Sequence, residues 1–238
     1  YNVVHYTLEL GEDYVGRRYD SFFTKIPVTK INSFKDKVED LIPQLRGELV
    51  IKEFPTGRAT MSTIESHLGK CADMGIKADL VIIDYVDLLS GRKKTRERKD
   101  EIDDIYSSAK GLARQLSVPI WSVSQVNRAG AQDKIIEGDK AAGSYDKMMI
   151  SDFAMSLSRT KEDKVNGTGR FHIMKNRYGM DGLTFSVNAD TSTGHFEVFD
   201  YKDTEETELA PKTTSNKFDT DVDSYDKQML WSKLKEFK

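Results

Sequence analysis

The sequence predicts an α/β fold, a layered sandwich in which helices cover a mostly parallel central sheet that antiparallel strands complete. The stretch Asp79–Asp84 has four consecutive apolar residues before its final carboxylate, which is typical of a strand buried on both faces of a parallel sheet. Residues 101–117 carry apolar side chains on one helical face, and a strand-like stretch, Pro119–Ser124, follows at once. Strands separated by helical stretches indicate βαβ units, and therefore parallel neighbours.

The remaining elements follow from the same periodicities and from end signals. Strands are predicted at Val3–Leu8, Leu49–Ile51, Phe153–Ser158, Phe171–Met174, Leu183–Val187 and His195–Phe199, of which the last two are the antiparallel closing strands. Helices are predicted at residues 12–25, 33–46 and 62–74. Ser33 is the expected N-cap of the second helix. Ser62 and Glu65 form the expected capping box of the third, and Gly75 is its expected C-cap.

The composition changes near residue 201. Residues 1–201 contain the predicted strands and helices and are expected to form one core domain. Residues 202–226 are rich in acidic residues, Thr and Ser, which is typical of a flexible linker. Tyr225–Phe237 regains enough apolar residues for a short amphipathic helix. Residues 202–238 are therefore expected to be an appendage, which either binds a partner or packs weakly on its own domain.

The bulk composition excludes several classes of protein. The net charge of −3 gives no overall basic field, so any nucleic-acid binding must come from local patches. Cys71 is the single cysteine, which excludes a disulfide framework, and the four histidines show no zinc-ligand spacing with it. No apolar run approaches the roughly 20 residues of a membrane span, and no signal peptide opens the chain. We therefore expect a cytoplasmic protein without a membrane partner.

Polar side chains follow several of the predicted strands at the point where each strand ends. They are Glu9, Asp84, Gln125, Lys175 and Arg177. In open parallel sheets, ligands bind beyond the carboxyl ends of the strands. The sequence therefore predicts a ligand site built from four different strands, which does not depend on any single motif.

Each of these side chains fits phosphate chemistry, and each has an ordinary alternative. Asp84 suits Mg²⁺, bound directly or through water beside nucleotide phosphates, but a strand-end Asp also caps turns. Glu9 suits the orientation or deprotonation of an attacking water, unless it faces solvent at a helix start. Gln125 suits a sensor of the terminal phosphate, or it is a solvated loop residue. Lys175 and Arg177 suit a phosphate clamp, or a charged hairpin edge.

Two further segments are basic or rich in glycine and lysine. Residues 92–99 contain six cations, at Arg92, Lys93, Lys94, Arg96, Arg98 and Lys99. A flexible loop of this kind between a strand and a helix can hold a nucleic-acid backbone, although charge runs are usually solvated surface. Arg128 and the stretch 130–144 form a second candidate loop.

Four segments resemble, in order and spacing, the DnaB-like replicative DNA helicases, which are hexameric and have a RecA-like fold. They are Val4–Leu10, Leu80–Leu89, Ser107–Arg128 and Met174–Gly179. They resemble, respectively, the strand with the catalytic glutamate, the Walker B segment, the sensor segment and the arginine-finger segment. The stretch 141–144, Asp152-Phe153 and the Lys-x-Arg-Tyr-Gly run are most similar to the helicases of large tailed phages.

The resemblance implies a role for each candidate residue. Glu9 would be the catalytic glutamate, Asp84 the Walker B aspartate and Gln125 the γ-phosphate sensor. Lys175 and Arg177 would reach the ATP site of a neighbouring subunit, which requires a closed head-to-tail ring. The two basic loops would hold single-stranded DNA in the channel. ATP and Mg²⁺ are the implied cofactors, a primase or helicase loader is an implied partner, and a bacterial host's cytoplasm is the compartment if a phage encodes the protein.

One element of that family is missing from the sequence. No Gly-x-x-x-x-Gly-Lys-Ser/Thr phosphate-binding loop (P-loop) occurs anywhere in the chain. We interpret the chain as a piece that begins after the first strand, the P-loop and its helix, and expect the piece alone to be inactive. Two alternatives stay open: a RecA- or KaiC-like recombinase or regulatory ATPase, and a non-catalytic nucleic-acid-binding scaffold module.

Overall fold

The computed structural model describes residues 1–91, 98–125, 134–136 and 145–201. These residues belong to one unit, Tyr1–Tyr201. Residues 202–238 form a second unit outside the described residues, and it contains the predicted linker and C-terminal helix.

The first half of the chain forms a parallel sheet of four strands in the order β2-β1-β3-β4. The strands are β1 (Val3–Thr7), β2 (Leu49–Glu53), β3 (Leu80–Asp84) and β4 (Ile120–Ser122), and every neighbouring pair is parallel. All their carboxyl ends therefore meet at one edge. This sheet confirms the predicted α/β class with parallel neighbours.

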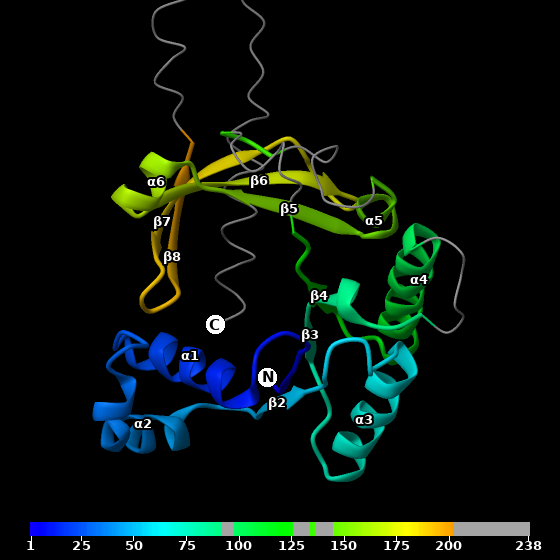
Figure 1. Ribbon diagram of the computed structural model, residues 1–238, viewed down its shortest axis with the longest axis horizontal. Helices are drawn as coiled ribbons and strands as arrows, with labels where there is room; N and C mark the ends of the chain where they lie inside the picture. The colour runs from blue at the N-terminus through cyan, green and yellow to red at the C-terminus, as the bar shows by residue number, and fades with distance from the viewer. Residues whose placement is uncertain (92–97, 126–133, 137–144, 202–238) are drawn as a thin grey trace, which may run out of the picture. The chain divides into compact units, whose positions relative to one another are not determined.

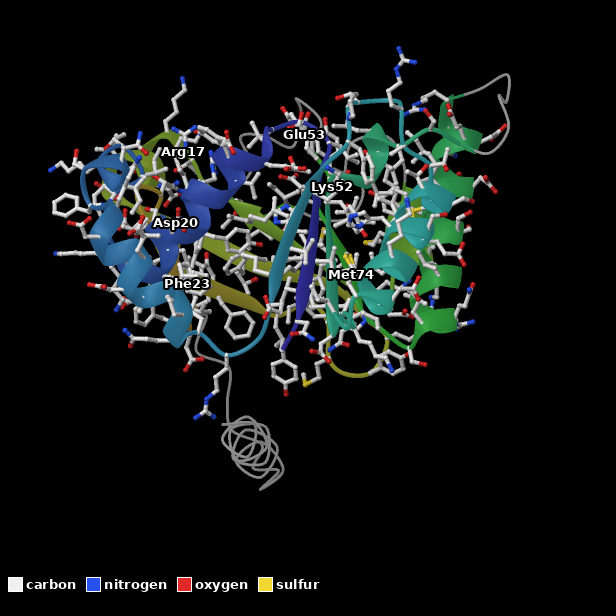
Figure 2. All side chains as sticks on the ribbon, turned by 90° about the horizontal axis from the view of Figure 1, so that it is seen from below. Arg17, Asp20, Phe23, Lys52, Glu53 and Met74 are labelled. Atoms are coloured by element: carbon white, nitrogen blue, oxygen red, sulfur yellow. The ribbon has the colours of Figure 1, made fainter. Side chains whose placement is uncertain are left out.

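Helices cover both faces of the parallel sheet. They are α1 (Glu12–Thr24), α2 (Lys35–Leu41), α3 (Met61–Asp73) and α4 (Arg98–Leu116). Figure 2 shows α1 and α2 on one side of the strands and α3 and α4 on the other. The main core lies on the second side, where Tyr6 and Ile64 are fully buried. On the opposite face, His5 Nδ1 lies 2.8 Å from the Tyr19 hydroxyl of α1, since strand neighbours alternate between faces.

The second half forms a separate antiparallel sheet in the order β5-β6-β7-β8 (Figure 1). Its strands are β5 (Phe153–Ser158), β6 (Thr168–Asn176), β7 (Thr184–Asp190) and β8 (His195–Asp200). Short helices α5 (Tyr145–Ile150) and α6 (Lys161–Asn166) flank β5. The antiparallel strands were expected, and the structure extends the predicted stretch Phe171–Met174 at both ends.

The antiparallel sheet contacts the parallel half at two places. At one, Phe22 of α1 stacks on His195 of β8, with ring centroids 4.6 Å apart. At the other, the Lys110 ammonium of α4 donates to the Asp152 carboxylate at 2.8 Å. Contacts from both ends of the sheet fix it against α1 and α4.

Two predicted helix starts are wrong. The predicted helix 33–46 is interrupted: a 3₁₀ turn occupies Ile31–Ser33, α2 runs Lys35–Leu41 after Phe34, and a second 3₁₀ turn follows at Ile42–Gln44. Ser33 is therefore no N-cap. Pro43 explains the early end, since a proline has no N–H to continue the helical hydrogen bonds.

The start of α3 also differs from the prediction. Thr60, not Ser62, is the N-cap, and it forms a reciprocal capping box with Thr63, whose N–H donates to Thr60 Oγ1 at 3.3 Å. Glu65 takes no part in this capping box. At the other end, Gly75 follows the C-cap Met74 with φ +91, a left-handed conformation that favours glycine.

Candidate functional site

The carboxyl edge of the parallel sheet brings together the ends of β1, β2 and β3. Thr7 pairs with Glu53 on one side and with Asp84 on the other. The N–H of Leu8 then donates to the Asp84 carbonyl at 2.9 Å, which continues the β1–β3 pairing by one residue. Asp84 consequently lies directly beside the turn that follows β1.

Glu9 lies on that turn and is exposed to solvent. The Thr7 hydroxyl is fully buried and bonds twice to Leu10, donating to its carbonyl at 2.7 Å and accepting from its N–H at 3.1 Å. The Thr56 hydroxyl donates to the Leu8 carbonyl at 2.6 Å. The backbone on both sides of Glu9 is thereby fixed, while its carboxylate stays accessible to a ligand.

Ser122 joins the end of β4 to the loop after Asp84. Its hydroxyl donates to the Ile83 carbonyl at 2.9 Å and accepts from the Val86 N–H at 3.0 Å. Asp84 lies between these two anchored residues and is half-buried. One hydroxyl therefore holds the backbone on both sides of the candidate metal-binding carboxylate.

Tyr85 connects the first three candidate residues, and the sequence reasoning missed it. Gln125 Nε2 donates to the Tyr85 hydroxyl at 3.4 Å. Burial raises the pKa of Tyr85, and the nearby charges of Glu9, Asp87 and Asp84 raise it further. The structure therefore brings Glu9, Asp84 and Gln125 to one edge around a neutral phenol. The signal available in the sequence was its position directly after Asp84.

Asp87 forms a second polar cluster behind this edge, also missed from the sequence. Its carboxylate accepts from the Lys147 ammonium at 2.5 Å and from the Tyr106 hydroxyl at 2.7 Å. Ser124 lies within 3.4 Å of the same carboxylate, next to Gln125 in sequence. Burial, followed by the Asp87 charge, raises the pKa of Tyr106 far above its usual value, so the phenol stays a donor.

Lys175 and Arg177 lie apart from this edge, at the end of β6. Lys175 Nζ donates to the carbonyls of Met148 and Met149 in α5, at 2.9 and 2.7 Å. Arg177 Nη1 lies 3.2 Å from the Asp152 carboxylate. Within the described residues, neither cation pairs with Glu9 or Asp84. The structure thus groups the two cations with each other, and separately from the three edge residues.

The charges around Lys175 and Arg177 perturb one another. The Lys110 ammonium, through its hydrogen bond and its charge, lowers the pKa of Asp152, and Arg177 adds to this effect. Burial lowers the pKa of Lys175, and the neighbouring Arg177 and Lys110 charges lower it further. Three cations therefore share one carboxylate, which leaves this end of β6 with a net positive charge.

The predicted basic loop is shorter than expected. Arg98 and Lys99 lie in the first turn of α4, because the helix begins three residues before the predicted range 101–117. Arg98 donates to the Asp87 carbonyl and to the Glu101 carboxylate, each at 2.6 Å. Outside the described residues lie Arg92, Lys93, Lys94, Arg96 and Arg128.

Metal-ligating side chains do not gather in threes anywhere in the described ranges. A single carboxylate such as Asp84 suits Mg²⁺ only where phosphate oxygens and water complete the coordination, which is the usual arrangement for that ion. None of the helices in the described part of the chain is long and apolar enough to span a membrane.

A parallel sheet with polar residues from several strands at its carboxyl edge, joined to antiparallel closing strands, defines a RecA-like α/β core. Comparison with protein families identifies it further: residues 1–197 match the family described as "DnaB-like helicase C terminal domain". This chain belongs to that family, which confirms the resemblance seen in the sequence.

Individual relatives agree with the family. The chain is 29% identical over 191 residues to a replicative DNA helicase DnaB of Mycobacterium intracellulare, covering 74% of this chain and 32% of that protein. It is 21% identical over 191 residues to the DnaB-like replicative helicase of Enterobacteria phage T4, covering 75% and 40%. The chain thus spans well under half the length of these relatives.

Solved structures show the same fold. One of them, a separately solved ATPase domain, superimposes with a TM-score of 0.70 and 23% identity, over 84% of this chain and 75% of that one. A DnaB-like replicative helicase, from a study of its interactions with primase, gives a TM-score of 0.69 and 22% identity, over 84% and 52%. These likenesses confirm the expected RecA-like fold.

Proposed function

We propose that this chain is the motor domain of an ATP-driven replicative DNA helicase, which unwinds duplex DNA by translocating along single strands. The observation that carries the proposal is the convergence of Glu9, Asp84 and Gln125 at one sheet edge in a chain of the DnaB-like family. Carboxylates and an amide at the carboxyl ends of parallel strands suit the handling of nucleotide phosphates.

The edge residues divide the work by their chemistry. Asp84 is half-buried with fixed backbone and would hold Mg²⁺, directly or through water. Mg²⁺, when bound with ATP, neutralises charge on the phosphates. Glu9 is exposed on a fixed turn and would orient the attacking water or accept its proton. Gln125 would contact the terminal phosphate and transmit its loss through Tyr85.

Lys175 and Arg177 would act on the ATP site of a neighbouring subunit. Their separation from Glu9 and Asp84 in the described chain supports a role in trans, since the same molecule does not bring the two sets into contact. A finger supplied in trans requires a head-to-tail ring, and we propose a hexamer. Arg177 is partly exposed, so it can leave Asp152 for a phosphate at little cost.

Single-stranded DNA is the proposed second ligand, held by its phosphates. The proposed contacts are Arg92, Lys93, Lys94, Arg96, Arg98, Lys99 and Arg128. The family supports this choice, as do cationic side chains next to both candidate catalytic segments. The cytoplasm, of a bacterial host if a phage encodes the protein, is the proposed compartment. A primase or a helicase loader remains the proposed partner of residues 202–238.

The phosphate-binding loop is proposed to lie upstream of Tyr1, with the first strand and its helix. Two strand edges support this arrangement. Trp121 and Val123 at the end of β4 are 48% and 58% exposed, and Met155 and Leu157 of β5 are each 40% exposed. Large apolar side chains on neighbouring strands that lack a partner on one side indicate a surface another element covers. Trp121 and Phe153 approach across this gap, with ring centroids 6.0 Å apart.

The experiment compares two polypeptides, Tyr1–Lys238 alone and the same chain extended through the upstream segment. We expect the extended protein to hydrolyse ATP and separate a forked duplex, and Tyr1–Lys238 alone to do neither, because it lacks the phosphate cradle. Glu9→Gln in the extended protein should abolish hydrolysis while retaining ATP binding. ATP hydrolysis by Tyr1–Lys238 alone, or wild-type hydrolysis by Glu9→Gln, would contradict the proposal.

The two alternatives predict different results in the same assays. A RecA- or KaiC-like ATPase would hydrolyse ATP without separating strands, and a recombinase would exchange them instead. A scaffold module would bind nucleic acid without hydrolysis in the extended protein. The family match and the Lys175-Asn-Arg177 segment favour the helicase over both.

A further inference from the structure

The ion pair between Asp87 and Lys147 is among the most deeply buried charge contacts in the described residues. Lys147 Nζ and Asp87 Oδ2 are 2.5 Å apart, with side chains only 6% and 17% exposed. Asp87 follows Asp84 by three residues, in the loop after β3, whereas Lys147 belongs to helix α5. The pair therefore joins the candidate Mg²⁺ segment to a helix 60 residues further along the chain.

The other end of α5 is held by the strand that carries the candidate trans-acting cations. Lys175 Nζ donates to the carbonyls of Met148 and Met149, and Lys110 Nζ donates to the carbonyl of Ile150 at 2.8 Å. Directly after the helix, the Asp152 carbonyl accepts from the Arg177 N–H at 2.9 Å. The same residue's carboxylate pairs with the Arg177 guanidinium.

Helix α5 thus contacts both sets of candidate residues, through its own Lys147 at one end and through Lys175 at the other. We propose that Lys147 and Asp87 are positioning residues that couple the state of one subunit's ATP site to the Lys175–Arg177 pair acting on the next subunit. This inference rests on the proposed function, and it adds a route between two sites that the proposed function leaves separate.

Physical chemistry favours transmission along this route over a purely local effect. The helix has six residues, too short for its own hydrogen bonds to be stable without tertiary contacts. A buried charge pair tolerates little separation, because either charge alone would be costly to leave inside the protein. A displacement of Asp87 therefore carries Lys147 with it, and with Lys147 the α5 carbonyls on which Lys175 is anchored.

The test uses the upstream-extended protein with four variants: Lys147→Met, Asp87→Asn, the two combined, and Lys164→Met as a matched control. Lys164 is an exposed lysine of α6 outside both sites. The double variant removes both charges together, so it avoids an unpaired buried charge and keeps the test valid if either single variant fails to fold. Circular dichroism and thermal unfolding establish which variants are folded.

The readout is the dependence of steady-state hydrolysis on ATP concentration. We expect the folded double variant to lose cooperativity between subunits, with a Hill coefficient near that of independent sites. Its kcat should fall at least about fivefold, the lower range of coupling between sites, while KM changes little. Lys164→Met should match the wild type. A folded double variant with wild-type Hill coefficient and kcat would overturn the proposal.

A second comparison separates positioning from simple destabilisation. If Lys147 acts through Arg177, then Lys147→Met should add no further loss of single-turnover rate to an Arg177→Ala background. Additive losses would show independent effects and would also overturn the inference. Failure of the proposed function is distinguishable, because it appears in the wild type and in Arg177→Ala alone: absence of hydrolysis in the first, or an unaffected rate in the second.

Discussion

Gln125 and Tyr85 touch at the candidate site although 40 residues separate them, with Gln125 Nε2 and Tyr85 Oη 3.4 Å apart. The contact joins the segment after β4 to the residue after Asp84. It gives the proposed phosphate sensor a defined partner, which loop residues without a tertiary contact lack. The hydroxyl of Tyr85 is therefore the first group to test.

Tyr85→Phe in the upstream-extended protein removes this hydroxyl and keeps the ring. A net contribution of about 0.5–1.5 kcal/mol for one hydrogen bond corresponds to roughly a two- to twelvefold loss of kcat. Tyr14→Phe is a matched control, because it removes an exposed contact of equal length, Arg18 Nη2 to Tyr14 Oη at 3.4 Å, away from the site. Equal rates for the two variants would remove Tyr85 from the site.

Arg177→Ala should abolish hydrolysis by about 10³-fold or more without unfolding the protein. The Arg177–Asp152 pair is about 40% exposed on both sides, so its loss costs at most about 1 kcal/mol of stability. The measurements are ATP turnover and thermal unfolding of the same preparation. Wild-type turnover in Arg177→Ala would remove the arginine from the mechanism.

Mixed rings test whether Arg177 acts in trans. Glu9→Gln and Arg177→Ala are each expected to be inactive alone. Rings reassembled from both should regain part of the activity, because a subunit with intact Glu9 then meets a neighbour with intact Arg177. Turnover that stays at the level of the separate variants would indicate that both residues act within one subunit.

Asp163 should make the stability of the antiparallel half depend on pH. Burial alone would raise its pKa, but hydrogen bonds from Arg170, Thr160 and Thr168 more than offset this and hold the pKa well below its usual value. A carboxyl with a depressed folded-state pKa stabilises the protein above its unfolded pKa of about 3.9, and this stability is lost as the pH falls further.

The variant Asp163→Asn should consequently cost about 1.5–3 kcal/mol near neutral pH, the range for hydrogen bonds to charged groups. The difference from wild type should shrink as the pH falls from about 5 towards 2. Urea unfolding across this range measures it. A difference that is independent of pH would show that the charge of Asp163 contributes nothing.

Trp121 should report the arrival of the upstream segment. It is 48% exposed in Tyr1–Lys238, and Trp231 is the other tryptophan of the chain. In a Trp231→Phe background, extension upstream should shift the emission of Trp121 to shorter wavelength and protect it from acrylamide quenching. Unchanged emission would mean that another element covers the end of β4.

The local pattern of the sequence was sufficient for most strands and for the residues that end them. Apolar runs of strand length and helical periodicity are properties of neighbouring residues, so β1, β3, β5 and α4 could be located without knowledge of the fold. Glu9 and Asp84 could be selected because each follows such a strand. Helix ends were less predictable, since Thr60 and Ser62 are both good caps and only the packing of α3 chose between them.

Tertiary structure alone decided which of these residues meet. The parallel register of β1 with β3 brings the turn of Glu9 beside Asp84, and pairing register depends on contacts between segments far apart in sequence. The same reason hid Tyr85, Asp87 and Lys147, whose partners lie 19 to 60 residues away. The sequence by itself determined the chemistry available at the ends of the strands, and long-range packing determined how it is grouped: three residues at one edge, two cations apart from them, and α5 between.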